Sequence, residues 1–123
     1  MSEALFVLKE GWLTKQGGVF KTWHKRWFSI VGRKLFYSKE RGKGEKGNVT
    51  LGESIIVDFA PETKKKNAFK IITPTRVYYI VAKDEEERAS WMTTLKSVID
   101  GTHENFKLTA ADVTILNTIS ETN

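Results

Sequence analysis

Basic side chains gather around a pair of glycines near the start of the chain. Lys15 precedes Gly17 and Gly18, and His24 and Arg26 follow them closely. Ammonium, imidazole and guanidinium groups all donate hydrogen bonds, and charge-assisted hydrogen bonds of this kind hold phosphate strongly. Glycines also allow backbone N–H groups to turn toward an anion. These residue types therefore predict a site for a small, highly charged anion.

Two strands must position these groups. Residues 7–14 and 22–31 are predicted to form a hairpin that turns at residues 16–18. Side chains alternate between the faces of a strand, and the apolar Phe28 and Ile30 mark the face toward the core. The inward set is then Gly11, Leu13, Lys15, His24, Arg26, Phe28 and Ile30, and the outward set is Trp12, Trp23, Lys25 and Trp27.

Inward cations are tolerated only near water, because an unpaired charge deep in a core is strongly unfavourable. Lys15, His24 and Arg26 lie at the strand ends nearest the Gly17–Gly18 turn. We therefore expect an open mouth at this end, where the cations stay hydrated. The aromatic rings among residues 11–30 are expected to seal the core.

The rest of the chain predicts five more strands and one helix. The strands are expected at 34–38, 48–51, 54–59, 68–73 and 76–82, with exposed connections at 39–47 and 61–67. In the helix, Asp84 and Glu87 suit an N-terminal capping box, Gly101 suits the C-terminal cap, and Trp91 belongs to an apolar stripe. This pattern predicts a mainly β fold, a sandwich or partly open barrel, with Trp91 plugging one end.

Composition restricts the function. The 123 residues include no cysteine and only two histidines, far apart, and no nucleophile–base pair is evident. Catalysis by this chain, a metal site and a bound cofactor are therefore not expected. No apolar segment approaches the roughly 20 residues of a membrane-spanning helix, so any membrane contact is expected to be peripheral.

The positive charge is concentrated at the front of the chain. Residues 1–50 hold eleven Lys and Arg against four Asp and Glu, whereas residues 51–123 hold nine against eleven. This asymmetry indicates an anionic partner. Nucleic acid is the less favoured partner, because most of the rings that would stack on bases are expected in the core.

The hairpin resembles that of the pleckstrin-homology (PH) domain family. The similarity lies in Gly11-Trp12-Leu13-Thr14-Lys15 and in residues 21–28, Lys-Thr-Trp-His-Lys-Arg-Trp-Phe, and the helix with Trp91 matches the end of the domain. Within the family, the start of the chain is most similar to the N-terminal domain of protein kinase B. The resemblance implies a seven-stranded barrel of two nearly orthogonal antiparallel sheets, capped by a C-terminal α-helix.

The resemblance also implies a phosphoinositide site. Its residues would be Lys15, Gly17, Gly18, Lys21, His24, Arg26, Tyr37 and Arg76. His24 stands where related domains usually have arginine or lysine, and a neutral imidazole offers one donor where arginine offers a planar fork.

The predicted organisation is a PH domain over residues 1–101 and a linker over residues 102–123 that leads toward a serine/threonine kinase catalytic domain. The function that the resemblance implies is recruitment of a cytoplasmic, monomeric module to the plasma membrane by head groups of the PIP3 and PI(3,4)P2 type. The alternative is a protein-interaction module on the same fold, with weak or no lipid specificity.

Overall fold

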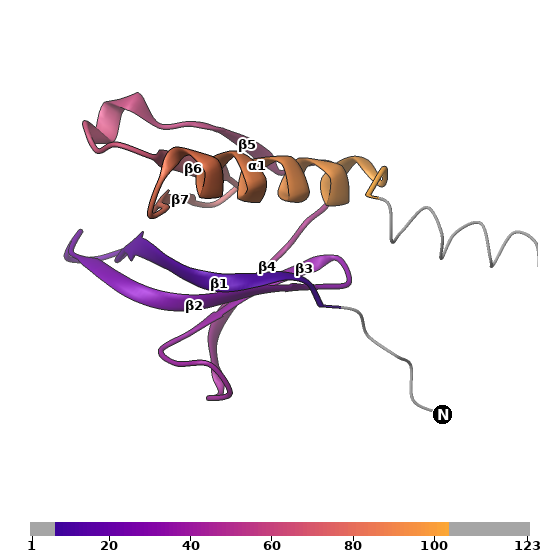
Figure 1. The fold of residues 1–123 in the computed structure, drawn as a ribbon, viewed down its shortest axis with the longest axis horizontal. Helices are drawn as coiled ribbons and strands as arrows, with labels where there is room; N and C mark the ends of the chain where they lie inside the picture. Colours follow the sequence, from indigo (N-terminus) through magenta and orange to yellow (C-terminus); the bar gives the residue numbers. More distant parts are fainter. Residues whose placement is uncertain (1–6, 104–123) are drawn as a thin grey trace, which may run out of the picture.

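Seven antiparallel strands form one hydrogen-bonded sheet in the computed structural model, which describes residues 7–103. The strands are β1 (Val7–Gln16), β2 (Trp23–Val31), β3 (Lys34–Ser38), β4 (Glu45–Thr50), β5 (Ile56–Phe59), β6 (Ala68–Ile72) and β7 (Val77–Val81). Their order in the sheet is β4-β3-β2-β1-β7-β6-β5, so β4 and β5 are open edges. In Figure 1, β1–β4 form one layer, and β5–β7 form the other with the helix α1 (Glu85–Asp100).

The sheet bends into two layers where β1 meets β7. β1 pairs with β2 over nearly its whole length, whereas it pairs with β7 only at Thr14↔Val81 and Lys15↔Ile80. This short junction leaves the two layers free to face each other across a common core. The predicted fold, a mainly β and partly open barrel with one C-terminal helix, is confirmed.

Both ends of α1 are capped as predicted. The Asp84 carboxylate accepts a hydrogen bond from the backbone N–H of Glu87 at 2.7 Å. Gly101 adopts the left-handed conformation, with φ 75°, and its N–H donates to the Ser97 and Val98 carbonyls. These caps satisfy backbone groups that the helix itself leaves without partners.

Trp91 of α1 occupies the centre of the core. Its side chain is fully buried, and its ring meets Phe28 of β2 edge-on, with ring centroids 6.4 Å apart. β1 packs directly against this ring, since a Cβ on Gly11 would lie at an ordinary contact distance of 3.7 Å from the indole. The other fully buried large side chains come from both layers and from α1: Ile30, Leu35, Leu51, Phe69, Ile71, Ile80, Leu95 and Val98. The prediction that Trp91 plugs the barrel is confirmed.

One local prediction needs correction. β4 begins at Glu45, inside the segment expected to be a loop, because Ser38 pairs with Glu45 across a β-bulge. The connection at 61–67 contains a 3-10 helix, Pro61–Thr63. The linker predicted from residue 102 lies, apart from residues 102 and 103, outside the described residues.

The expectation that the rings of residues 11–30 seal the core is wrong for the tryptophans. Trp12 is 43% exposed, and Trp23 and Trp27 are half-buried. The alternation of β1 and β2 places all three on the outer face, as predicted from the sequence. The side chains that lie over their rings are the cations Lys25, Lys65 and Arg41 rather than a packed helix or strand. Phe28 is the aromatic residue of this hairpin that is buried.

Candidate functional site

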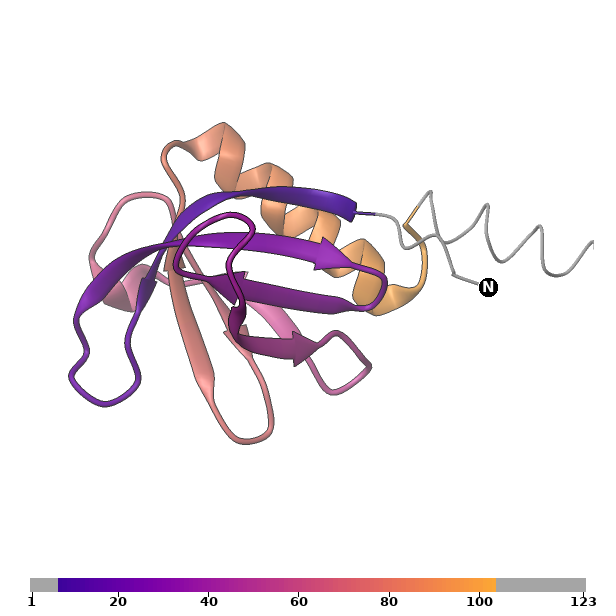
Figure 2. The ribbon, with the colours of Figure 1, turned by 90° about the horizontal axis from the view of Figure 1, so that it is seen from below.

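A cavity of about 230 Å³ lies beside the turns between β1 and β2 and between β6 and β7. Figure 2 shows these two turns extending on the same side of the molecule, away from α1. The cavity is lined by Lys15, Gly17, Gly18, His24, Arg26, Tyr37, Lys46 and Arg76. Seven of the eight predicted site residues are thus brought together. Lys21 is the exception and lines an adjacent hollow that shares Gly17, Gly18 and Arg76.

Lys15 is buried at the base of this cavity, with 8% of its surface exposed. Its ammonium group lies 4.6 Å from the ring centre of Tyr37 and 5.7 Å from that of Tyr78. Burial, followed by repulsion from Arg76, Arg26 and Lys46, lowers the pKa of Lys15 to about 8. The expectation that this cation stays hydrated at an open mouth is therefore wrong.

Arg76 reaches the cavity from the connection between β6 and β7. Its guanidinium lies 4.2 Å from the ring centre of Tyr78, a cation–π distance. On the other side it approaches Gly18, where a Cβ would lie 3.3 Å from a guanidinium nitrogen. A glycine at residue 18 therefore allows the hairpin turn and Arg76 to lie close together.

Tyr37 forms one wall of the cavity. Its ring packs on Phe28 at 5.6 Å and on Tyr78 at 6.4 Å. Burial, followed by the neighbouring Tyr78, raises the pKa of Tyr37, while Arg76 and Arg26 act against the rise. Gly47 pairs with Tyr37, and a Cβ on Gly47 would overlap the tyrosine hydroxyl. The glycine thus makes room for this side chain.

His24 and Arg26 lie on the inner side of β2 near the turn, as the alternation predicts. The His24 Nε2 shares a 2.8 Å hydrogen bond with the Thr22 hydroxyl, and an Arg26 nitrogen donates to the Lys25 carbonyl at 2.9 Å. Both contacts are local and exposed. They hold the two side chains at the rim without neutralising any charge.

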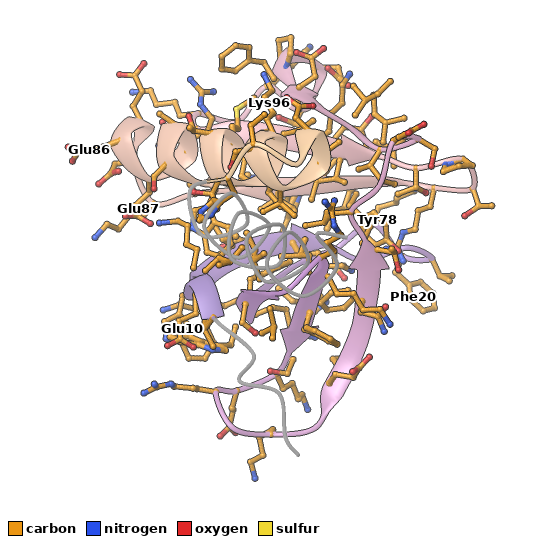
Figure 3. The ribbon with its side chains drawn as sticks, turned by 90° about the vertical axis from the view of Figure 1, so that its right-hand side faces the viewer. Glu10, Phe20, Tyr78, Glu86, Glu87 and Lys96 are labelled. Carbon is orange, nitrogen blue, oxygen red and sulfur yellow. The ribbon has the colours of Figure 1, made fainter. Side chains whose placement is uncertain are left out.

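Two residues of the site were missed in the sequence. Lys46 is the extra residue of the β3–β4 bulge, because Tyr37 pairs with Gly47 while Ser38 pairs with Glu45. A bulge commonly redirects a side chain, and Lys46 lines the cavity. Tyr78 lies between the two layers in Figure 3 and contacts both Lys15 and Arg76.

The electrostatics of the cavity favour an anion. Lys15, Arg26, Lys46 and Arg76 contribute four cations, and no acidic residue is among those that line it. Within residues 7–103, none of these four side chains takes part in a salt bridge. Several donors therefore converge on one small space with their charge uncompensated, which is the arrangement that binds phosphate groups.

Comparison with known proteins is consistent with this geometry. The family model described as the PH domain matches residues 7–100. A PH domain-containing protein of Dictyostelium discoideum is 43% identical over 96 residues, 76% of this chain and 21% of that protein. A RAC family serine/threonine-protein kinase homolog of the same organism is 40% identical over 87 residues, 70% of this chain and 20% of the kinase. The chain thus spans about a fifth of the length of these relatives.

A solved structure shares the fold. The C-terminal PH domain of pleckstrin, crystallised in complex with D-myo-Ins(1,2,3,5,6)P5, superimposes with a TM-score of 0.67 at 27% identity. The match covers 76% of this chain and 95% of that one. Since the family model matches residues 7–100, most of the chain, the chain belongs to the PH domain family.

Proposed function

We propose that this domain binds phosphorylated inositol head groups in the cavity beside the β1–β2 turn and thereby attaches its protein to a membrane surface. The observation that carries the proposal is the convergence of Lys15, Arg26, Lys46 and Arg76 on one cavity without an acidic neighbour. An inositol carrying several phosphates offers charges that can meet these cations at once.

The lowered pKa of Lys15 supports the same conclusion. The ammonium is both desolvated and repelled by three other cations. The charged form of Lys15 is therefore destabilised in the unbound domain. A phosphate in the cavity would replace this repulsion by attraction and would supply hydrogen-bond acceptors. Ligand binding therefore relieves an instability that the empty site carries.

The relatives support a finer proposal, preference for inositides phosphorylated at the 3-position. The mouse protein named as a dual adapter for phosphotyrosine and 3-phosphotyrosine and 3-phosphoinositide is 37% identical over 89 residues, 72% of this chain. The pleckstrin domain noted above was crystallised with an inositol pentakisphosphate. We infer that head groups of the PIP3 and PI(3,4)P2 type are the natural ligands of this site.

Vesicle sedimentation tests the proposal. The domain should pellet with phosphatidylcholine vesicles that contain a few per cent of PI(3,4,5)P3, and soluble inositol tetrakisphosphate should release it. Vesicles carrying an equal charge as phosphatidylserine are the control, and binding to them should be weaker and strongly salt-dependent. Equal binding to both vesicle types, with no competition by the soluble head group, would contradict a phosphoinositide site.

The tip of the β1–β2 hairpin is suited to enter the bilayer. Val19 and Phe20 are 82% and 84% exposed, and Phe20 projects away from both layers in Figure 3. They lie next to Gly17 and Gly18, which line the anion cavity. A domain held by its head group at this cavity would place both apolar side chains against the acyl chains.

Replacing Val19 and Phe20 together by serine should weaken vesicle binding by roughly 100-fold or more, because burying each side chain fully is worth about 1.5–3 kcal/mol. The affinity for soluble inositol tetrakisphosphate should stay unchanged, since neither side chain lines the cavity. A parallel loss of both affinities would show that the tip shapes the cavity rather than entering the bilayer.

Similarity to the RAC family kinase homolog supports two further proposals. The domain would be the regulatory module of a serine/threonine kinase, with residues 102–123 as the connection, and it would act as a monomer recruited from the cytoplasm to the plasma membrane. In the full-length protein, the residues after Asn123 would then form a kinase lobe that contains the ATP-binding lysine. No helix within residues 7–103 is long and apolar enough to cross a membrane.

A further inference from the structure

The outer face of β1 and β2 carries a tryptophan ridge, defined here as Trp12 and Trp27. The two residues are directly paired across the strands, and their rings meet edge-to-face at 5.3 Å. Trp12 is 43% exposed and Trp27 is half-buried. A long cationic side chain lies beside each ring, Lys25 at 5.3 Å from Trp12 and Arg41 at 5.5 Å from Trp27.

A hollow lies on each side of the ridge. The first, of about 360 Å³, lies beneath the β3–β4 connection, and Trp27, Phe36, Glu10, Arg41 and Glu45 are among its lining residues. The second, of about 270 Å³, lies where β1 meets β7, and its lining includes Trp12, Lys25, Val81, Ala82 and Lys83. An aromatic ridge between two hollows can receive an extended chain that places a side chain in each.

The ridge also offers hydrogen-bond donors. The indole N–H groups of Trp12 and Trp27 have no hydrogen-bond partner within residues 7–103, and both rings retain exposed surface. A polyproline II helix is the complementary ligand, because it has no internal hydrogen bonds and presents its carbonyl groups outward. Its prolines lie on one face every third residue, and they dock on aromatic-lined grooves with little loss of conformational entropy.

We propose that the tryptophan ridge binds a proline-rich segment in the polyproline II conformation, flanked by acidic residues. The acidic flank follows from the charges around the ridge. Lys25 and Lys83 line the second hollow, which has no acidic lining residue. An Asp or Glu next to the prolines would meet these two ammonium groups. The first hollow shares Tyr37 with the anion cavity, whereas the second hollow shares none of its lining residues. The inference does not depend on the proposed lipid binding.

A single-stranded nucleic acid fits the ridge less well. Single-stranded nucleic acids bind along a uniformly basic groove. The first hollow is not uniformly basic, because Glu10 and Glu45 line it beside Arg41 and Lys43. Arg41 is also engaged by Glu10 at 3.4 Å. The observations therefore favour a peptide.

The two binding surfaces lie on different parts of the domain. Glu10, at the first hollow, and Phe20, at the tip of the hairpin, lie at opposite margins of Figure 3. A peptide on the ridge would therefore leave the hairpin tip free for a bilayer. The domain could hold a membrane and a protein partner at the same time.

The test is a titration followed by ¹⁵N–¹H NMR. The probe is an equimolar pool of synthetic decapeptides with two acidic residues at the N-terminus, proline at every third following position and random residues between. The indole N–H signals of Trp12 and Trp27 should shift with increasing peptide, whereas that of the fully buried Trp91 should not. A second pool with every proline replaced by alanine should shift them at least tenfold less at equal concentration.

Two variants separate this site from the anion cavity. Trp12→Ala should weaken peptide binding at least tenfold and leave the affinity for inositol tetrakisphosphate unchanged. Arg26→Ala, in the cavity, should have the opposite pattern. Failure of the lipid proposal would therefore leave the peptide result intact, and the reverse also holds.

Three results would overturn the inference. The first is the absence of indole shifts with the proline pool in the parent domain, which requires no variant to fold. The second is a stronger response to a ten-residue oligothymidylate, which would assign the ridge to nucleic acid. The third is a shift of the same signals on raising the concentration of the domain alone, which would assign the ridge to a second copy of this chain.

Discussion

Replacing Trp91 by alanine should destabilise the domain by about 3–5 kcal/mol, the usual consequence of emptying a large aromatic site in a packed core. Trp91 is fully buried and contacts Phe28 of the opposite layer, so the loss separates the helix from the sheet that it covers. Domains of this size are stable by only about 5–15 kcal/mol. Urea unfolding followed by circular dichroism should therefore show a much lower midpoint, with the variant close to unfolding at 37 °C.

Trp12→Ala is the matched control for this change. It removes the same side chain from the outer face, where Trp12 is 43% exposed, and it should cost about 1 kcal/mol through the lost contact with Trp27. Trp91→Phe keeps most of the volume and should fall between the two. If Trp91→Ala and Trp12→Ala unfold at the same urea concentration, α1 does not close the barrel.

Lys15→Met should raise the stability of the unbound domain and lower its affinity for inositol phosphates. The unbound variant should be more stable than the parent by about 1–2 kcal/mol at pH 7, because the free energy stored in a lowered pKa is released, less the part that solvent screens. The affinity for inositol tetrakisphosphate should fall roughly 10- to 100-fold with the loss of a charge-assisted contact. Thermal melting of the unbound proteins and calorimetric titration provide the two readouts.

The pH dependence of the free energy of unfolding tests whether the desolvated Lys15 causes this difference in stability. The pKa of Lys15 is about 8 in the folded domain against an ordinary value of 10.5, so in this interval the unfolded chain holds the proton that the folded domain has lost. The stability of the parent should therefore rise between about pH 8 and 10.5, whereas below pH 8 the full penalty remains. Lys15→Met should lack this increment. Equal pH profiles of the parent and Lys15→Met would show that Lys15 is not desolvated. The comparison is limited to pH 7–9, because Tyr37 and Tyr79, whose pKa values are raised, do not titrate in that range.

The sequence was informative where a short-range rule decides the structure. Alternation along β1 and β2 correctly placed Lys15 and Arg26 on the face of Phe28, because side-chain direction in a strand depends only on residue parity. The caps at Asp84 and Gly101 were likewise predictable from local backbone geometry. A buried tryptophan at residue 91 followed from the helical period.

Features that depend on long-range pairing were not predictable. Lys46 enters the cavity only because a bulge leaves it unpaired between β3 and β4, and no local rule sets that register. The burial of Lys15 depends on Tyr37 and Tyr78, which β3 and β7 bring together from the two layers. The sequence placed the outward tryptophans on the correct face of the sheet but wrongly expected them to be buried. Whether another element covers a sheet face depends on the whole topology.

Whether the cation-lined cavity binds phosphorylated inositols can be decided by one calorimetric comparison. Inositol tetrakisphosphate is titrated at fixed salt into the parent, into Arg26→Ala, and into Arg41→Ala, which removes an exposed arginine that does not line the cavity. We expect a loss of affinity of roughly 10- to 100-fold for Arg26→Ala, a loss of less than about twofold for Arg41→Ala, and unchanged folding of both variants. Equal affinities for the parent and a well-folded Arg26→Ala variant would contradict binding in this cavity.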